Sequence, residues 1–275
     1  FMPIPKPEST NKGRTVLVKT IAITGASRGI GASAAFALAA PGRRLILMAR
    51  SEDKLRDTQS AVEHKGGEAI IAPADLSSRE GAEKATESLL DRTNGQLDVL
   101  ILNAGTSNHS DFINSDLDAI EYELRLNYLS PLVMLRRCLP HMVHQKEGGH
   151  VICVGSLASL MPFPGEASYA ASKAALLSLL RSLRVELRDQ PIKLTMVLPG
   201  YTSTAMTENH RSLLPAMSSE RVGVAIAKAI ADQPRVVIPG LSNRLAARLF
   251  QTFPGVSDRI LKRFADLLVP TVTQP

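Results

Sequence analysis

Short apolar segments alternate with longer amphipathic segments along most of the chain. The apolar segments are the expected strands, and they cover residues 21–24, 45–49, 68–72, 97–102, 150–155, 192–198 and 235–238. Helical patterns fill the intervals at residues 32–40, 51–65, 77–93, 115–145, 167–188 and 218–233. Such alternation produces right-handed βαβ units, whose parallel strands are covered on both faces and are therefore apolar throughout. The pattern predicts the α/β class, with a doubly wound parallel sheet and helices on both faces.

Some segments depart from this rhythm. Residues 15–18 precede the first strand, and they either extend it or pair at an edge of the sheet. Pro131 and Pro140 lie within the long helical pattern, and we expect them to bend or break it because proline cannot donate the backbone hydrogen bond of a helix. Residues 201–216 carry hydroxyl groups and scattered apolar side chains, with prolines nearby, which is typical of a mobile cover over a pocket.

The end of the chain, residues 241–268, has the pattern of two short amphipathic helices separated at Pro254 and Gly255. We expect this basic tail to dock on the body of the protein or on a second subunit, although a membrane-surface enzyme would use a similar tail. No internal linker or repeat divides the chain. We therefore expect one domain, residues 1–275, with a core at about 16–240 and a helical C-terminal extension at 241–275.

Composition is that of an ordinary globular protein, since 44% of the 275 residues are apolar and 21% are charged. Apolar runs fall far short of the ~20 residues that a membrane span requires, and the first residues lack the apolar core of a secretory signal. Cys138 and Cys153 lie in apolar surroundings, which favours buried thiols over a disulfide framework or a metal cluster. These features favour a cytoplasmic protein.

The formal net charge of +6 raises the question of nucleic-acid binding. The basic residues are spread along the chain, and no basic run alternates with aromatic residues, which make up 4% of the chain. We therefore expect no nucleic-acid partner and attribute the excess positive charge to a polyanionic cofactor. His109, His141, His144 and His150 lack metal-ligand spacing with acids or cysteines, so we expect no metal.

A glycine-rich turn, Gly25-Ala-Ser-Arg-Gly29-Ile-Gly31, joins the first strand to the first helix. Glycines at such a junction allow backbone N–H groups to approach a pyrophosphate, whose charge the helix N-terminus favours. The second strand of dinucleotide folds usually ends at an acid that binds the ribose hydroxyls, but Ala49 and Arg50 stand here. An arginine can bind a 2′-phosphate that an acid would repel, and Arg28 adds a second cation. The sequence therefore favours NADP(H) over NAD(H).

Tyr169 and Lys173 are four residues apart, about one helical turn, so both side chains project from the same face. An isolated phenol has a pKa of about 10, and lowering it to about 7 requires roughly 4 kcal/mol. A cation about 4 Å away supplies energy of that order at an effective dielectric near 20. The pair is therefore a candidate device for proton transfer beside the bound nucleotide.

These features together resemble the single-domain branch of the short-chain dehydrogenase/reductase family. The resemblance covers about residues 16–240 and rests on six motifs in the family's order and spacing: Thr24 with the glycine turn, Asn103-Ala-Gly105, Asn127, Ser156, Tyr169-Ala-Ala-Ser-Lys173, and Pro199-Gly200. It implies a Rossmann-type sheet of about seven strands and hydride transfer between a nicotinamide and a carbonyl or alcohol. One departure is Leu102, where the family usually has an asparagine.

The resemblance also implies a role for each matching residue. Tyr169 would act as the acid/base, and Ser156 would hydrogen-bond the substrate oxygen. Lys173 would bind the nicotinamide ribose and lower the pKa of Tyr169, while Asn127 would hold a water that connects Lys173 to solvent. The expected cofactor-binding residues are Gly25, Ser27, Arg28, Gly29, Ile30, Gly31, Arg50, Ser51, Asp75, Leu76, Asn103, Ala104, Gly105, Tyr169, Lys173, Pro199, Gly200, Thr202 and Thr204.

The function that we expect is NADPH-dependent carbonyl reduction, or the reverse alcohol oxidation. Residues 157–168 and 201–216 would form the pocket walls, and their apolar side chains suggest a hydrophobic ketone: Met161, Phe163, Met206, Leu213 and Leu214. The alternative is a non-catalytic dinucleotide sensor or scaffold on the same fold. The family associates through its fourth and fifth helices, so the resemblance implies a homodimer or homotetramer.

Overall fold

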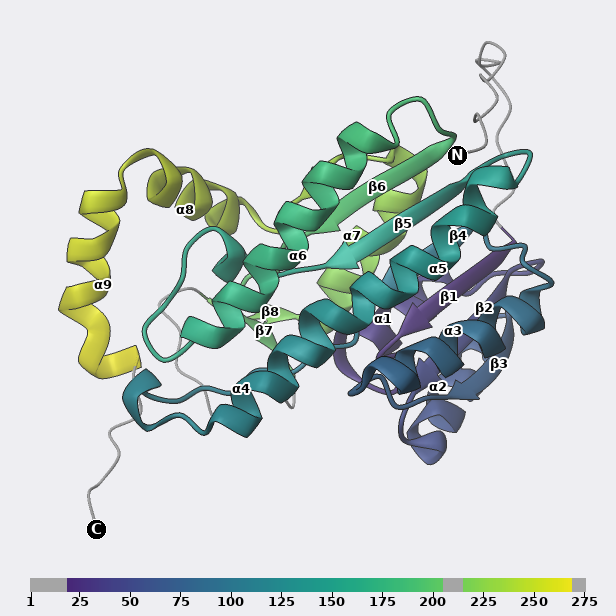
Figure 1. Cartoon of the computed structure of the whole chain (residues 1–275), viewed down its shortest axis with the longest axis horizontal. Coiled ribbons are helices and arrows are strands. Elements are labelled where there is room, and N and C mark those ends of the chain that lie inside the picture. Colours follow the sequence, from purple (N-terminus) through teal and green to yellow (C-terminus); the bar gives the residue numbers. More distant parts are fainter. Residues whose placement is uncertain (1–18, 205–214, 269–275) are drawn as a thin grey trace.

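A parallel sheet of seven strands forms the centre of the described molecule (Figure 1). The computed structural model describes residues 19–204 and 215–268, with side chains as far as residue 263. The strand order along the sheet is β3-β2-β1-β4-β5-β6-β9. The strands are β1 Thr20–Thr24, β2 Arg44–Ala49, β3 Glu68–Pro73, β4 Val99–Leu102, β5 Gly149–Val154, β6 Ile192–Val197 and β9 Val236–Val237. The order reverses between β1 and β4, so the predicted doubly wound, Rossmann-type fold is confirmed.

Helices cover both faces of this sheet (Figure 1). On one face lie α1 (Gly29–Leu38), α2 (Glu52–His64) and α7 (Ser219–Asp232), which pack on the side chains of Ile21 and Ile23. On the other face lie α3 (Arg79–Thr93), α5 (Ser130–His144) and α6 (Ala167–Glu186), which pack on Ala22. Alternate residues of a strand point to opposite faces, so one apolar strand supplies both cores. The fully apolar strands of the sequence are explained by this double burial.

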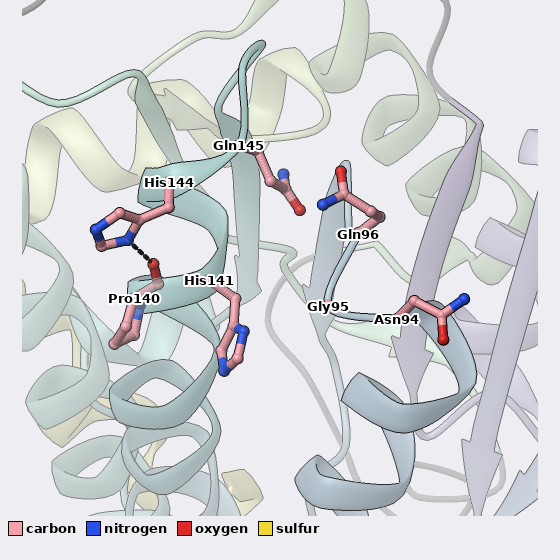
Figure 2. Close-up of a pocket in the computed structure, with 7 residues that line it drawn as sticks. All are labelled: Asn94, Gly95, Gln96, Pro140, His141, His144 and Gln145. Atoms are coloured by element: carbon pink, nitrogen blue, oxygen red, sulfur yellow. Dashed lines mark hydrogen bonds between the residues drawn. The ribbon is translucent and has the colours of Figure 1, made fainter.

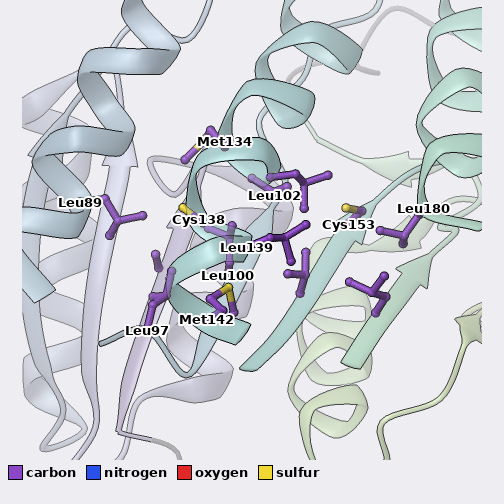
Figure 3. Close-up of a cluster of buried hydrophobic side chains, with 14 of the residues drawn as sticks. Leu89, Leu97, Leu100, Leu102, Met134, Cys138, Leu139, Met142, Cys153 and Leu180 are labelled. Atoms are coloured by element: carbon purple, nitrogen blue, oxygen red, sulfur yellow. The ribbon is translucent and has the colours of Figure 1, made fainter. Parts of the chain in front are cut away.

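Figure 3 shows the core that α3, α5 and α6 form against β4, β5 and β6. Cys138 of α5 and Cys153 of β5 are both fully buried in it. Burial raises the pKa of each thiol to about 12, so neither forms an appreciable thiolate near neutral pH. The sequence-based view of both cysteines as buried apolar residues is confirmed.

The long helical segment is irregular just before Pro131, whereas Pro140 does not break it. It consists of α4 (Leu117–Leu124), a π-helical turn at Arg125–Leu129, and α5, which continues through Pro140 to His144. Neither proline ends the helix, because Pro131 lies in the first turn of α5, where a helix tolerates it. Pro131 has no N–H, so it cannot donate to the carbonyl of Asn127 four residues earlier. A π turn accommodates that missing hydrogen bond.

The C-terminal extension consists of two helices, α8 (Leu241–Thr252) and α9 (Pro254–Leu268), divided where the sequence predicts. A short parallel pair, β7 (Thr202–Ser203) with β8 (Met217–Ser218), was not predicted and brackets the expected pocket cover. Residues 15–18, Met206, Leu213 and Leu214 lie outside the described residues. No helix in the described part of the chain is long and apolar enough to cross a bilayer.

Candidate active site

The predicted site residues gather at the carboxyl edge of the sheet. Most of them lie in the segments that follow successive strands: residues 25–31 after β1, Arg50 and Ser51 after β2, Asp75 and Leu76 after β3, Asn103, Ala104 and Gly105 after β4, Ser156 after β5, and Pro199, Gly200, Thr202 and Thr204 after β6. Asn127 comes from the π turn, whereas Tyr169 and Lys173 come from α6. In an open parallel sheet, this edge at the reversal of strand order is where nucleotides bind.

The glycine turn is shaped by close backbone contacts. Gly25 has φ of +66°, which favours glycine. A Cβ at Gly31 would lie 2.1 Å from the carbonyl oxygen of Gly25, so only glycine fits there. The Asn103 side-chain amide donates to the carbonyl oxygens of Thr24 and Gly25 at 3.0 and 3.3 Å. Thr24 Oγ1 in turn accepts from the backbone N–H groups of Asn103 and Ala104 at 2.9 and 3.0 Å. The turn is therefore fixed from the neighbouring strand, as a pyrophosphate cradle requires.

Cationic side chains lie where the adenosine end of a dinucleotide would bind. Arg28 and Arg50 are both exposed, and Arg50 donates a hydrogen bond to the hydroxyl of Tyr122 at 3.0 Å. Hydrogen bonding from the Ser77 backbone lowers the pKa of Asp75, with a smaller contribution from the charge of Arg50. The site thus offers Arg50 beside Asp75, with no acid on β2 to repel a 2′-phosphate. Tyr122 is a contact that the sequence analysis missed, because α4 is far from Arg50 in sequence.

Ser156 begins a short helical turn immediately after β5. Its Oγ accepts from the backbone N–H of Ala158 at 3.1 Å, and its extended backbone is that of an N-cap residue. The N–H of Leu157 donates to the carbonyl oxygen of Pro199 at 2.9 Å, which joins this turn to the segment after β6. The Ser156 hydroxyl also hydrogen-bonds the Tyr169 phenol and lowers its pKa. The predicted serine and tyrosine are therefore brought together.

Asn127 is fully buried and joins three segments. Its Oδ1 accepts from the N–H of Thr106 at 2.9 Å, and its Nδ2 donates to the Thr106 carbonyl oxygen at 2.9 Å and to Ser172 Oγ at 3.0 Å. A Cβ at Gly105 would lie 2.8 Å from Asn127 Oδ1 and 3.1 Å from Lys173 Nζ. A larger residue at position 105 would therefore push apart two of the predicted catalytic groups. Ser172 and Thr106 are positioning residues that the sequence analysis did not identify.

Lys173 of α6 contacts the backbone of β5 and lies near the ring of Tyr169. Lys173 Nζ donates to the carbonyl oxygen of Val154 at 3.2 Å and lies 5.8 Å from the centroid of the Tyr169 ring. Burial lowers the pKa of Lys173 to about 8. Burial also raises the pKa of the Tyr169 phenol above its usual value, and the Ser156 hydrogen bond only partly opposes this. In this structure, therefore, desolvation is the largest influence on the phenol pKa, and the effect of Lys173 on that pKa stays a prediction.

The carboxyl groups of Glu123 and Glu166 act on Tyr169 through their charge, and His109 lies near Glu166. The sequence analysis assigned none of the three a role. Burial, followed by the charge of Glu123, raises the pKa of Glu166 to about 7. Burial likewise raises the pKa of Glu123, whose Oε1 accepts from the N–H of Asn108 at 2.8 Å. His109 Nδ1 lies 4.0 Å from Glu166 Oε1. The position of Glu166 three residues before Tyr169, at the start of a helix, was the one signal in the sequence that could have identified it.

A cavity outlined by described residues lies at the opposite edge of the sheet. Its volume is about 360 Å³, and Figure 2 shows its lining between the start of β4 and the end of α5. The lining residues are Asn94, Gly95, Gln96, Pro140, His141, His144 and Gln145. None of them belongs to the predicted site. In the described part of the chain no three His, Cys, Asp or Glu residues are placed to hold a metal ion.

The arrangement can bind a dinucleotide and transfer a proton. Glycines leave room for phosphate oxygens at a helix N-terminus, and exposed arginines supply positive charge in the glycine turn (Arg28) and after β2 (Arg50). Ser156 and Tyr169 present two hydroxyl groups that can donate hydrogen bonds to one substrate oxygen. Lys173 and Asn127 lie behind them, where they can carry charge or relay a proton.

Comparison with known proteins also indicates an oxidoreductase that binds a dinucleotide. The sequence profile described as short chain dehydrogenase matches residues 19–214. An uncharacterized oxidoreductase of Mycobacterium tuberculosis is 33% identical over 249 residues, which cover 89% of this chain and 96% of that protein. A fatty acyl-CoA reductase of Acinetobacter baylyi is 30% identical over 260 residues, which cover 93% of this chain and 86% of that protein.

Solved structures share the fold. A metagenomic short-chain oxidoreductase in complex with NADP superposes with a TM-score of 0.69 at 30% identity, covering 81% of this chain and 98% of that one. A short-chain dehydrogenase/reductase from Burkholderia phymatum in complex with NAD gives a TM-score of 0.76 at 21% identity, covering 87% of this chain and 95% of that one. At 21% identity the second likeness concerns the fold alone.

Proposed function

The chain belongs to the short-chain dehydrogenase family, and we propose that it is an NADP(H)-dependent oxidoreductase that interconverts a carbonyl group and a secondary alcohol. One observation carries this proposal. Ser156, Asn127 and the pair of Tyr169 with Lys173 come from three separate segments and meet at the carboxyl edge of the sheet, beside the glycine turn. A scaffold protein would need only the glycine turn.

In the direction of reduction, Ser156 and Tyr169 hold the substrate oxygen by hydrogen bonds and polarise its carbonyl group. A nicotinamide cofactor held by the glycine turn would supply the hydride for the carbonyl carbon. As negative charge develops on the oxygen, the Tyr169 phenol gives it a proton, and the bond that breaks is the phenol O–H bond. Lys173 stabilises the resulting phenolate, and Asn127 holds the segment through which a proton from solvent replaces the one that was lost.

Cofactor preference is proposed from the charges at the end of β2. Arg50 is exposed beside Asp75, and Ala49 occupies the place of the ribose-binding acid. An arginine binds a phosphate dianion through two parallel hydrogen bonds, which an uncharged ribose hydroxyl cannot reproduce. The solved relative at 30% identity binds NADP, which agrees with this assignment.

A hydrophobic carbonyl substrate is proposed from the pocket wall. Leu157, Met161 and Phe163 follow Ser156, and they pack with Ala247 and Phe250 of α8 in a small apolar cluster. These side chains lie next to the catalytic serine, where they favour an apolar substituent on the carbonyl carbon. The name of the Acinetobacter relative refers to a fatty acyl substrate, which is of the same chemical character.

We also propose that the chain acts as one domain in the cytoplasm and assembles as a homodimer or homotetramer. Its self-association would use α5 and the long α6, as the sequence analysis expects. Ala171 is exposed on α6, and such a small side chain allows close approach of a second helix. Sedimentation velocity on the purified chain measures this mass directly.

Replacement of Tyr169 by Phe tests the enzymatic assignment. The variant keeps the ring and loses the proton donor, so kcat should fall by about 10²–10⁴-fold, while the affinity for NADPH changes little. NADPH affinity is measured by calorimetry, and turnover by NADPH oxidation with a panel of apolar ketones and aldehydes. Tight NADPH binding without turnover of any compound by the unaltered chain would favour the sensor or scaffold instead. Unchanged turnover in the variant would refute the role of Tyr169.

A further inference from the structure

The helices α8 and α9 project from the body of the protein beside the active-site edge (Figure 1). The inner face of α8 packs on the body, because Asn243 and Ala247 are buried and Phe250 contacts the ring of Phe163 at a centroid distance of 6.3 Å. Asn243 Nδ2 also donates to the carbonyl oxygen of Pro239 at 2.8 Å. One face of α8 is therefore occupied by contacts with the body of the protein, and these contacts hold the helix beside the segment that follows Ser156.

The opposite face of α8 carries a row of large apolar side chains that the described residues leave uncovered. Leu241, Leu245 and Leu249 recur every four residues of α8 and are 70%, 59% and 41% exposed, and Phe253, directly after the end of the helix, is 54% exposed. Residues four apart lie above one another on a helix, so the three leucines form one continuous stripe. A single exposed leucine is ordinary, whereas a stripe of large apolar residues indicates a binding surface.

The second helix continues this surface. Among residues 254–263 of α9, only Ser257 is buried, and Val256 is exposed. Arg259 and Arg263 follow Val256 by three and seven residues and lie on the same side of the helix. Both arginines are exposed. In this described part of α9, an apolar residue is therefore flanked by cations and is not packed on the sheet.

Charge identifies the partner that fits this surface. Residues 241–263 contain four arginines and one lysine, but only one acid, Asp258. Arg248 is exposed and lies three residues after Leu245, so positive charge borders the apolar stripe as well. A symmetric contact between two copies would bring these cations together without acids to neutralise them. A membrane with anionic lipids offers hydrocarbon for the stripe and phosphate groups for the cations.

We propose that the outer face of α8 and α9 binds the surface of membranes that contain anionic lipids. In this arrangement the helices lie in the plane of the interface, with the apolar stripe below the headgroups and the arginines at their level. The inner face of α8 would continue to pack on Leu157, Met161 and Phe163. Membrane attachment would therefore hold the wall of the active site at the lipid surface, where an apolar substrate could enter.

Binding of the full chain to vesicles tests this proposal. Vesicles of phosphatidylcholine alone and of phosphatidylcholine with phosphatidylserine are sedimented with the protein, and the bound fraction is measured. We expect binding to the anionic vesicles that weakens as salt is added. Arg259→Gln with Arg263→Gln should lower the partition coefficient about fivefold for each charge removed. Lys54→Gln with Lys146→Gln is the matched control, because these exposed lysines lie elsewhere and should change it little.

The apolar contribution is tested at Leu245 and Leu249. Gln at both positions should lower binding about tenfold or more, because two large side chains no longer enter hydrocarbon. Val224→Gln removes an apolar residue that is 61% exposed on α7 and should leave binding unchanged. The chain has no tryptophan, so Leu245→Trp provides a single reporter whose emission should shift to the blue with anionic vesicles. Val224→Trp should show no such shift.

Three outcomes would overturn the proposal. The first is no binding to anionic vesicles at low salt, and the second is binding that the Leu245 and Leu249 changes leave intact. The third is a fall in oligomer mass in sedimentation velocity when these leucines are replaced, without any binding of the unaltered chain to vesicles. That last result would show that a second copy covers the stripe. Each readout is independent of catalysis, so none depends on the proposed reaction.

Discussion

The carboxyl group of Glu166 gives the most quantitative prediction, because burial moves its ionisation into the neutral range. Its side chain is 21% exposed at the start of α6, and its pKa is raised from 4.5 to about 7 by burial and then by the charge of Glu123. The folded protein therefore binds more protons than the unfolded chain between these two pH values. Its free energy of unfolding falls as pH rises through this window, and the full penalty is present above about pH 7.

Replacement of Glu166 by Gln should remove that penalty. The difference between 4.5 and about 7 corresponds to about 3 kcal/mol, of which about 2 to 3 kcal/mol develops between about pH 5 and about pH 8. The stability of the Gln variant minus that of the unaltered chain should therefore grow by this amount across the window. Urea unfolding followed by circular dichroism at a series of pH values measures the difference. Glu63→Gln, an exposed residue of α2, is the control and should give a flat difference.

The same substitution should affect catalysis. The charges of Glu166 and Glu123 raise the pKa of the Tyr169 phenol, so removal of one charge should move the pH dependence of alcohol oxidation toward lower pH. A stability difference that runs flat from about pH 5 to about pH 8 would refute the ionisation of Glu166 in the neutral range. An unchanged pH profile of kcat/KM would separately refute its coupling to Tyr169.

Further predictions follow from individual contacts. Arg50→Asp should shift the ratio of NADPH to NADH affinity toward NADH by about tenfold or more, measured by calorimetry, because a charge-assisted hydrogen bond becomes a repulsion. Gly31→Ala should abolish nucleotide binding or folding, because its Cβ would lie 2.1 Å from a carbonyl oxygen; calorimetry and circular dichroism separate the two. Burial lowers the pKa of His150 to about 4, so the free energy of unfolding of the unaltered chain should fall as pH drops from 6.5 to about 4. His150→Gln should abolish this fall, measured by urea unfolding.

Much of the fold could be predicted because the apolar runs in the sequence match the strands that the folded sheet buries on both faces. The apolar runs at residues 45–49 and 192–198 became β2 and β6 with shifts of one residue at their ends, since a strand buried on both faces must be apolar throughout. The helix break fell at the π turn rather than at Pro140, because a proline is locally tolerated where its neighbours pack well. The pair β7 and β8 was missed, since a strand of two residues has no periodicity to detect.

The sequence by itself determined which segments form the strands, the glycine turn and the tyrosine–lysine spacing, because each depends on residues close together in the chain. Only the tertiary structure decided how the groups at the site affect one another. Lys173 Nζ lies 5.8 Å from the centroid of the Tyr169 ring, and Glu166 and His109 come together although they are 57 residues apart in the chain. Distances and desolvation in a packed interior depend on all neighbours at once, so no local pattern encodes them.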